Sequence, residues 1–163
     1  MDPIEIVNTV KECVIKGVEQ LEQLGISSQE IKSVGISNQR ETTVVWDSET
    51  GQPLYNAIVW LDSRTSTLAE ESIARTKSRS KDEFKEKTGL PIHPYFSALK
   101  LRWLMENVDA VKKAKAEGRL RFGTVDSWLI YKLTGEHVTD VTNASRTLLL
   151  GKLPLLLRKI TAF

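Results

Sequence analysis

Two neighbouring residues of opposite charge, Arg40 and Glu41, stand between two stretches that are rich in β-branched residues. Adjacent residues of a strand point to opposite faces, so both side chains can reach one ligand only where the backbone turns. At such a turn the arginine offers a fork of hydrogen-bond donors and the glutamate offers acceptors, a combination that suits the neighbouring hydroxyls of a polyol. An ordinary solvated charge pair is the alternative, and both interpretations stay open on the residues alone.

Two aromatic residues, Trp60 and Tyr95, could complete such a site. An aromatic face packs well against the C–H side of a polyol, although aromatic residues near strand ends and proline bends also pack in ordinary cores. Metal chemistry has less support, because His93 and His137 lie far apart and lack acidic or cysteine neighbours at ligand spacing. The sequence also lacks the GxxxxGK[ST], GxGxxG and HExxH motifs.

The composition is that of a folded protein of modest size. The chain has 163 residues, with 23 Lys+Arg against 21 Asp+Glu, 40% hydrophobic and 27% charged residues. Since a domain averages about 150 residues, this length predicts one domain or a piece of a larger protein. The near-balance of charge disfavours a nucleic-acid or membrane binder, and no apolar run approaches the roughly 18 residues of a membrane span. A single cysteine, Cys13, excludes an internal disulfide, and we expect a cytoplasmic protein without a nucleic-acid partner.

A long amphipathic helix is predicted at the start of the sequence. Asp2 suits the N-cap, Pro3 the first helical position, and Gly25 the end of the helix. Apolar residues recur three or four positions apart and predict one buried stripe, which consists of Ile4, Val7, Val10, Val14, Val18, Leu21 and Leu24.

Three strands are predicted next, at residues 31–37, 42–47 and 54–60, because these stretches are β-branched or alternate in polarity. The intervening residues 48–53 (SETGQP) have the chemistry of a turn and predict a hairpin. The short gap between the first two strands favours antiparallel neighbours as well.

The remainder of the sequence is predicted to be helical. A capping box at Ser80–Glu83 opens a helix that Gly89 ends, residues 95–117 hold one or two helices, and residues 126–133 form another that ends at Gly135. Together these elements predict an α/β fold, in which helices pack on a small, mostly antiparallel sheet. Because three strands leave edges and a face to be covered, the sheet is expected to be part of a larger one.

Several motifs resemble those of the FGGY carbohydrate kinases. Residues 95–107 (YFSALKLRWLMEN) are similar to the first signature of that family. Further stretches resemble the glycerol kinases within it, namely GISNQRETT at 35–43, NAIVW at 56–60, TGLP at 88–91, GTVDSWLI at 123–130 and TDVTNASRT at 139–147. The resemblance covers nearly the whole chain, and the Arg-Glu pair distinguishes glycerol kinases from the pentulose and hexose kinases.

The resemblance implies a fold, a reaction and a site. The fold is part of the N-terminal domain of an actin-like, ribonuclease-H-like ATPase, and the parent reaction transfers the γ-phosphoryl group of ATP-Mg²⁺ to glycerol. In glycerol kinases the residues that match Arg40 and Glu41 bind the glycerol hydroxyls, the match of Trp60 packs against the carbon chain, and the match of Tyr95 helps to close the pocket. Whole members of the family commonly form oligomers.

The sequence departs from the family pattern at both ends. The resemblance places the phosphate-binding turn before residue 1, and the catalytic aspartate and second domain beyond the last residue. Residues 1–147 are expected to form part of the kinase N-terminal domain, whereas the leucine-rich residues 148–163 do not resemble the family. We therefore expect the chain alone to bind ATP-Mg²⁺ poorly and to be inactive. The alternative to a kinase piece is a non-catalytic module that binds a partner.

Overall fold

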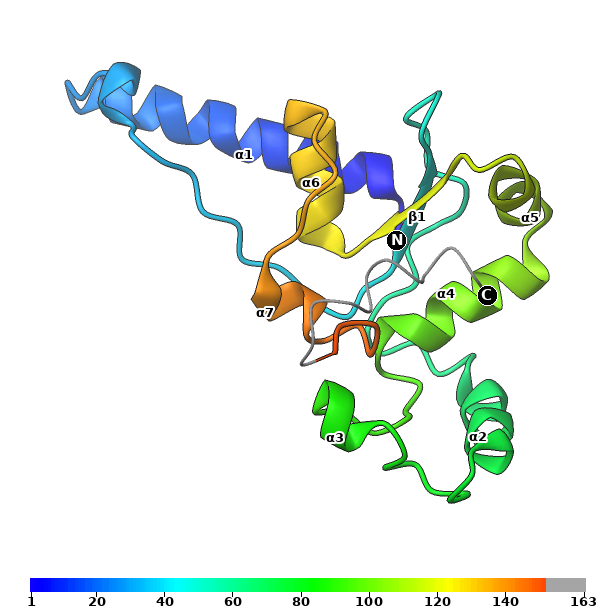
Figure 1. Cartoon of the computed structure of the whole chain (residues 1–163). Helices are drawn as coiled ribbons and strands as arrows, with labels where there is room; N and C mark the ends of the chain where they lie inside the picture. The colour runs from blue at the N-terminus through cyan, green and yellow to red at the C-terminus, as the bar shows by residue number, and fades with distance from the viewer. Residues whose placement is uncertain (152–163) are drawn as a thin grey trace.

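The computed structural model of the chain describes residues 1–151. Figure 1 shows a short sheet at the centre, with α1 and α6 on one side and α4 and α5 on the other. In chain order the elements are α1 (Pro3–Gln23), the 3-10 helix η1 (Ser28–Glu30), β1 (Val44–Asp47), α2 (Ser66–Arg75), α3 (Lys85–Thr88), α4 (Ser97–Asn107), α5 (Asp109–Ala116), β2 (Leu120–Gly123), α6 (Val125–Thr134) and α7 (Val141–Ala144).

The sheet differs from the predicted one in its strands. Within the described residues it pairs β1 with β2 in antiparallel register, from Val44 opposite Gly123 to Asp47 opposite Leu120. The predicted strand at 54–60 folds back on β1 as expected of a hairpin, but it makes only one isolated antiparallel bridge, Ile58 with Thr43. A second bridge joins Trp46 to Pro53, just before that segment. The expected small antiparallel sheet is therefore present, with residues 120–123 rather than 54–60 as its second strand.

The strand predicted at residues 31–37 is wrong. This segment runs between η1 and the turn before β1 without forming a strand. A β-branched sequence becomes a strand only when a neighbouring strand accepts and donates its backbone hydrogen bonds, and no strand of the described part pairs with it. Its apolar side chains are correspondingly open to solvent, as Val34 shows with an exposed fraction of 78%.

Helix α1 begins and ends as predicted, but only its first half is covered. The Asp2 carboxylate accepts a hydrogen bond from the Ile4 N–H at 2.8 Å, and Gly25 takes a left-handed conformation with φ 77° just beyond the helix. Val7 is buried, whereas Val14 is 53% exposed and Leu24 is 76% exposed. Figure 1 shows the reason, because α1 projects well past the sheet. The predicted buried stripe is thus wrong for the second half of the helix.

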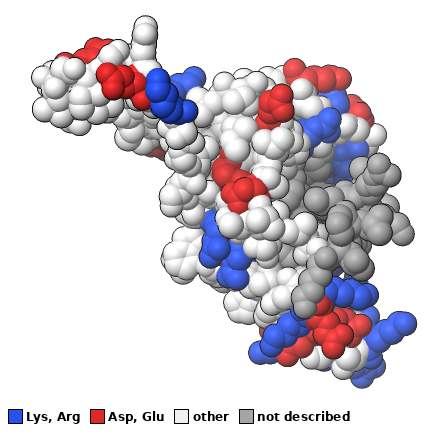
Figure 2. All heavy atoms as spheres, turned by 60° about the vertical axis from the view of Figure 1, so that its left-hand side comes forward, with Lys and Arg blue, Asp and Glu red and all other residues white. Residues whose placement is uncertain are grey.

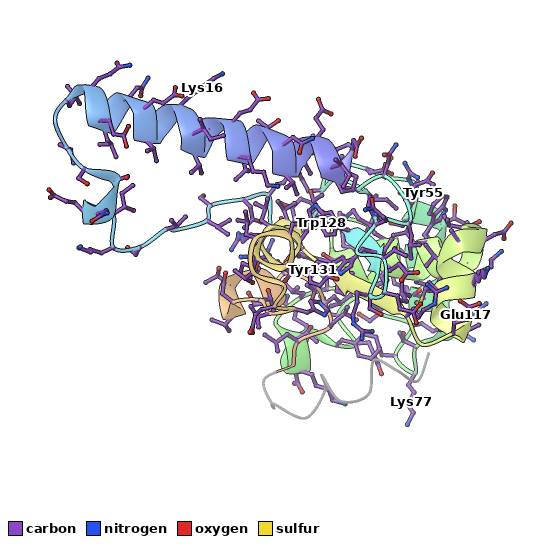
Figure 3. The ribbon with its side chains drawn as sticks, turned by 90° about the horizontal axis from the view of Figure 1, so that it is seen from above. Lys16, Tyr55, Lys77, Glu117, Trp128 and Tyr131 are labelled. Carbon is purple, nitrogen blue, oxygen red and sulfur yellow. The ribbon has the colours of Figure 1, made fainter. Side chains whose placement is uncertain are left out.

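The two faces of β1 organise two apolar clusters. Val44 and Trp46 face α1 and α6, where they pack with Val7 and Trp128. Figure 3 shows Trp128 and Tyr131 on α6 close to the start of α1, while Lys16 stands on the projecting part. The Trp128 indole donates to the Pro3 carbonyl at 2.8 Å and so ties α6 to the first turn of α1.

The opposite face of β1 is covered by the helices that follow it in sequence. Val45 and Ile58 pack there with Leu101 and Leu104 of α4 and with Val111 of α5. The predicted helical region at 95–117 is thus confirmed as two helices, α4 and α5. The first residue of α4 is hydrogen-bonded to the turn before β1. The predicted site residues Arg40 and Glu41 lie in that turn, and Tyr95 lies in the segment before α4.

The helix predicted after the capping box is shorter than expected. Only Lys85–Thr88 form helix α3, and Gly89 ends it with φ 80°. The Glu83 carboxylate accepts hydrogen bonds from the backbone and hydroxyl of Ser78, so it does not turn back to Ser80 as a capping box requires. Helix α6 and its end at Gly135 agree with the prediction.

Most of the predicted tail at 148–163 lies outside the described residues. Of its described part, Leu149 packs against the cluster around Val45. Among the helices of residues 1–151, none has the length and apolar character needed to cross a bilayer. Figure 2 shows acidic and basic residues in mixed groups on the face that it presents.

Candidate functional site

Glu41 lies at a turn, as its sequence position predicts. Residues 40 and 41 form the turn that leads into β1, and the Thr42 N–H donates to the Gln39 carbonyl at 3.2 Å. Glu41 is only 4% exposed. Its backbone carbonyl accepts a hydrogen bond from the Ser97 hydroxyl at 3.1 Å, which joins the turn to the first residue of α4.

The carboxylate of Glu41 is paired with an arginine that the sequence pattern does not single out. The Nε of Arg146 donates to Oε1 of Glu41 at 2.7 Å. Because 105 positions separate the two residues, no local spacing could reveal the pair. The only sequence signal is that Arg146 stands inside the TNASRT stretch that resembles the glycerol kinases.

Arg40, the predicted partner of Glu41, differs from it in exposure. It is exposed, whereas Glu41 is buried, although the two are adjacent in the turn. The buried ion pair of Glu41 is therefore made by Arg146 rather than by Arg40. Arg40 is therefore not part of the ion pair that Glu41 makes, and the structure does not bring it together with the other predicted site residues.

Trp60 and Tyr95 lie against each other. Their ring centroids are 5.8 Å apart and the ring planes meet at 69°, an edge-to-face contact. Trp60 is 39% exposed, so the pair is open to solvent on one side. The structure thus brings together two aromatic residues that lie on separate segments, one following the hairpin and the other preceding α4.

Arg146 connects the aromatic pair with Glu41. Its guanidinium carbon lies 5.9 Å from the centre of the Tyr95 ring and 5.0 Å from that of Phe96. A guanidinium over an aromatic face is favourable and fixes the direction of the arginine. Glu41, Arg146, Tyr95 and Trp60 therefore form a continuous chain of contacts, which we call the turn cluster.

The helix that carries Arg146 into place is capped by an acidic residue. Hydrogen bonds from the side chains of Thr142 and Asn143, with smaller contributions from their backbone N–H groups, lower the pKa of Asp140 to about 2. Asp140 is the N-cap of the short helix α7, and Arg146 is the second residue after the end of that helix. Asp140 thus helps to direct Arg146 toward Glu41.

Several buried polar atoms in the residues that follow Glu41 and on α7 have no hydrogen-bond partner within the described residues. They include the hydroxyls of Thr42 and Thr43, both 0% exposed, and the side-chain oxygen of Asn143. A buried hydroxyl without a partner is costly, so such atoms indicate a place where a ligand or a further polypeptide segment completes the hydrogen bonding.

The described part of the chain gives little support to two other kinds of site. It contains no group of three or more His, Cys, Asp and Glu that could hold a metal ion. An open hollow of about 400 Å³ lies between α2 and the segment around Glu83, with Ser72, Arg75 and Phe84 in its lining. None of the predicted site residues borders this hollow.

Comparison with known proteins identifies the family. The profile of the FGGY family of carbohydrate kinases, N-terminal domain, matches residues 1–151. A probable glycerol kinase from Caenorhabditis elegans is 71% identical over 150 residues, which are 92% of this chain and 30% of that protein. A glycerol kinase from Arabidopsis thaliana is 49% identical over 156 residues, again 92% of this chain and 30% of its relative. The chain thus spans about 30% of the length of these relatives.

Solved structures agree with the sequence matches. Glycerol kinase from Plasmodium falciparum, crystallised with ADP, has a TM-score of 0.84 and 43% identity over 92% of this chain and 29% of that structure. Gluconate kinase from Lactobacillus acidophilus has a TM-score of 0.74 and 27% identity, covering 95% of this chain and 28% of its own. These matches confirm the predicted fold, part of an actin-like ATPase domain. The chain belongs to the FGGY family of carbohydrate kinases and corresponds to its N-terminal domain.

Proposed function

We propose that this chain carries part of the glycerol pocket of an ATP-dependent glycerol kinase, whose reaction transfers the γ-phosphoryl group to a terminal hydroxyl of glycerol and gives glycerol 3-phosphate. The observation that carries the proposal is the turn cluster, in which Arg146 links a buried carboxylate to two aromatic rings in contact. The relatives named glycerol kinase support the choice of polyol.

Each residue has a role that follows from its chemistry. Glu41 accepts hydrogen bonds from glycerol hydroxyls, and Arg40 donates to their oxygens. Trp60 and Tyr95 pack against the carbon chain, which is the apolar side of the ligand. Arg146 holds the Glu41 carboxylate in one orientation, so that its second oxygen is available to the substrate.

The nucleotide belongs to the parent enzyme in this proposal. ATP with Mg²⁺ supplies the phosphoryl group. Positively charged groups near the phosphates stabilise the transition state of the transfer. The described residues offer no cluster suited to Mg²⁺, so we assign none of them to the metal. A cytoplasmic location and association of the parent enzyme into oligomers complete the proposal.

Titration of the 163-residue chain with glycerol tests the pocket. We expect weak binding, with a dissociation constant well above micromolar, seen as NMR shifts of the Trp60 and Tyr95 rings. Glu41→Gln should weaken binding by about tenfold or more, because a hydrogen bond to a charged acceptor contributes roughly 1.5–3 kcal/mol. Glu12→Gln, on the exposed side of α1, is the matched control and should not change the affinity.

Two outcomes would contradict this proposal. If Trp60 and Tyr95 do not respond to glycerol at any attainable concentration, the chain holds no polyol site. If 1-propanol, which has a single hydroxyl, produces the same shifts as glycerol, the site recognises an alkyl chain rather than neighbouring hydroxyls.

The uncovered half of α1 supports a second candidate, a module that binds another protein. Val14 on α1, Leu24 just beyond it and Val34 in the segment after η1 are more than half exposed, and exposed apolar surface often marks interaction sites. Glycerol titration distinguishes the two candidates, whereas a coupled assay for ADP release with glycerol and ATP-Mg²⁺ tests whether the chain is catalytic by itself. We expect no turnover by the chain alone, and turnover that disappears in Glu41→Ala would show that it is catalytic by itself.

A further inference from the structure

Lys100 places a positive charge in the interior behind the turn cluster. It lies in the first turns of α4 and is 0% exposed. Burial of an ammonium group is costly unless it is paired and hydrogen-bonded. A positive charge near a helix N-terminus is also opposed by the helix dipole. An apolar residue would fill this position without either penalty.

The ammonium group of Lys100 is held by the backbone of the segment that carries Tyr95. It donates to the carbonyl of Pro94 at 3.0 Å and also to the carbonyl of Tyr95. The Pro94 carbonyl accepts a second hydrogen bond, from the Thr65 hydroxyl at 3.4 Å. The lysine therefore fixes two successive peptide groups on the approach to α4.

Those peptide groups determine where the Tyr95 ring lies. The ring belongs to the residue whose carbonyl is held, and its centre is 6.0 Å from the Lys100 nitrogen. The ring also meets Trp60 and Arg146. A rotation of the Tyr95 peptide would separate the two aromatic rings of the turn cluster.

Charges from separate segments surround Lys100. Burial lowers the pKa of Lys100 to about 8, while Asp62 from the segment after Trp60 and Glu41 from the turn before β1 both favour its protonated form and oppose that shift in part. Arg146 is paired with Glu41, and Arg64 is paired with Asp62 at 2.7 Å. Tyr95 is the titratable group whose ring faces the lysine.

We infer that Lys100 is a positioning residue of the polyol site, which holds the Pro94 and Tyr95 carbonyls so that the tyrosine ring stays against Trp60. This inference rests on the proposed function and names a residue that acts through Tyr95 rather than by contact with glycerol. A residue that served only to fill the core could be replaced by an apolar one of similar length without any effect on the ligand.

The test compares Lys100→Met with the wild-type chain. Methionine keeps much of the length of the side chain but donates no hydrogen bond. Lys113→Met, on the exposed face of α5, is the matched control. Two quantities are measured, the nuclear Overhauser effect between the Trp60 and Tyr95 rings and the affinity for glycerol.

We expect Lys100→Met to fold, to lose the ring-to-ring effect, and to bind glycerol at least about tenfold more weakly, with both quantities unchanged in Lys113→Met. An unchanged ring contact would overturn the inference whatever glycerol does. If the wild-type chain does not bind glycerol, the proposed function fails, whereas the ring contact still shows whether Lys100 positions Tyr95.

A measurement on the wild-type chain covers the case in which Lys100→Met does not fold. The Lys100 side chain should titrate near pH 8, and the carbonyl ¹³C shift of Tyr95 should change with the same midpoint, because the two groups share a hydrogen bond. A Tyr95 carbonyl shift that does not follow the titration of the lysine would show that the bond is absent in solution.

Discussion

At the scale of single residues, the turn cluster is held by the ion pair between Glu41 and Arg146. The Glu41 side chain is 5% exposed and that of Arg146 is 29% exposed. Water can therefore still solvate the arginine if the pair breaks, whereas the buried carboxylate would lose its counter-charge. Removing one partner of a buried ion pair leaves an uncompensated charge, which costs more than the pair contributes. The pair also joins the turn before β1 to the segment after α7.

Arg146→Met should therefore destabilise the chain by about 2 kcal/mol, less than the roughly 3–5 kcal/mol for a fully buried pair because Arg146 is partly solvated. Urea unfolding measures the change. Arg75→Met in the last turn of α2 is the control, and it should cost less than about 1 kcal/mol. Equal stabilities of Arg146→Met and the wild type would mean that the ion pair is not formed in solution.

The pH dependence of stability follows from Lys100. Because its pKa falls from 10.5 in the unfolded chain to about 8 in the folded chain, the unfolded state binds more protons between these values. The free energy of unfolding should accordingly rise with pH between about 8 and 10.5, by an amount on the order of 3 kcal/mol from this group. Urea unfolding of the wild type and of Lys100→Met at each pH gives a difference in the free energy of unfolding, and this difference isolates the contribution of Lys100. A difference that stays flat across this window would contradict the shift.

At the scale of elements, the sheet and α6 approach each other unusually closely at Gly123, where β2 ends. A Cβ atom on Gly123 would lie 2.6 Å from the Cβ of Ser127 and 3.0 Å from the Trp46 ring. Glycine is required there for packing rather than for its backbone angles. Gly17 in the middle of α1 is the opposite case, since a Cβ atom added there would meet nothing within 4 Å.

These two glycines give a matched pair of substitutions. Gly123→Ala should destabilise the chain by about 1–3 kcal/mol through overpacking. Gly17→Ala should stabilise it by roughly 0.5–1 kcal/mol, because alanine restricts the unfolded chain and favours a helix. Thermal or urea unfolding of both variants checks the signs. Stabilisation by Gly123→Ala would show that β2 and α6 are further apart than described.

The elements also show how far local sequence signals reach. The ends of α1, α3 and α6 are predictable because Asp2, Gly89 and Gly135 act locally. The strand at 120–123 is not evident from the sequence and the strand predicted at 31–37 is wrong, since strand formation depends on a partner elsewhere in the chain.

The same limit holds for the candidate site. Arg40, Glu41, Trp60 and Tyr95 can be named as candidates from the sequence, but only the resemblance to the glycerol kinases favours a site over an ordinary charge pair and core aromatics. Arg146 and Lys100 emerge only from tertiary contacts, since their partners lie on other segments or are backbone carbonyls.

At the scale of the whole molecule, the apolar core is uneven. The clusters on either face of β1 are well covered, while the distal half of α1 and the segment that runs back from η1 are not. Figure 1 shows these two segments together at the end of the molecule that projects from the sheet. Stability should therefore depend on the central part of the chain.

Two valines of the same helix test this distribution. Val7→Ala should cost about 1–3 kcal/mol, because Val7 is 3% exposed and packs in the cluster with Trp46. Val14→Ala should be neutral or slightly stabilising, since Val14 is 53% exposed and alanine has the higher helix propensity. Urea unfolding of each variant gives the comparison. A cost at Val14 similar to that at Val7 would mean that the distal half of α1 is covered in solution.

The partial exposure of Trp60 provides an optical reporter of the candidate site without any added label. Trp46 and Trp128 are 0% exposed and Trp103 is half-buried, whereas Trp60 is 39% exposed. A small neutral quencher such as acrylamide should thus quench the fluorescence of Trp60 most, that of Trp103 less, and that of the two buried indoles hardly at all. Occupation of the site would shield Trp60, so the fraction of quenchable emission, calibrated with Trp60→Phe, would report occupancy directly.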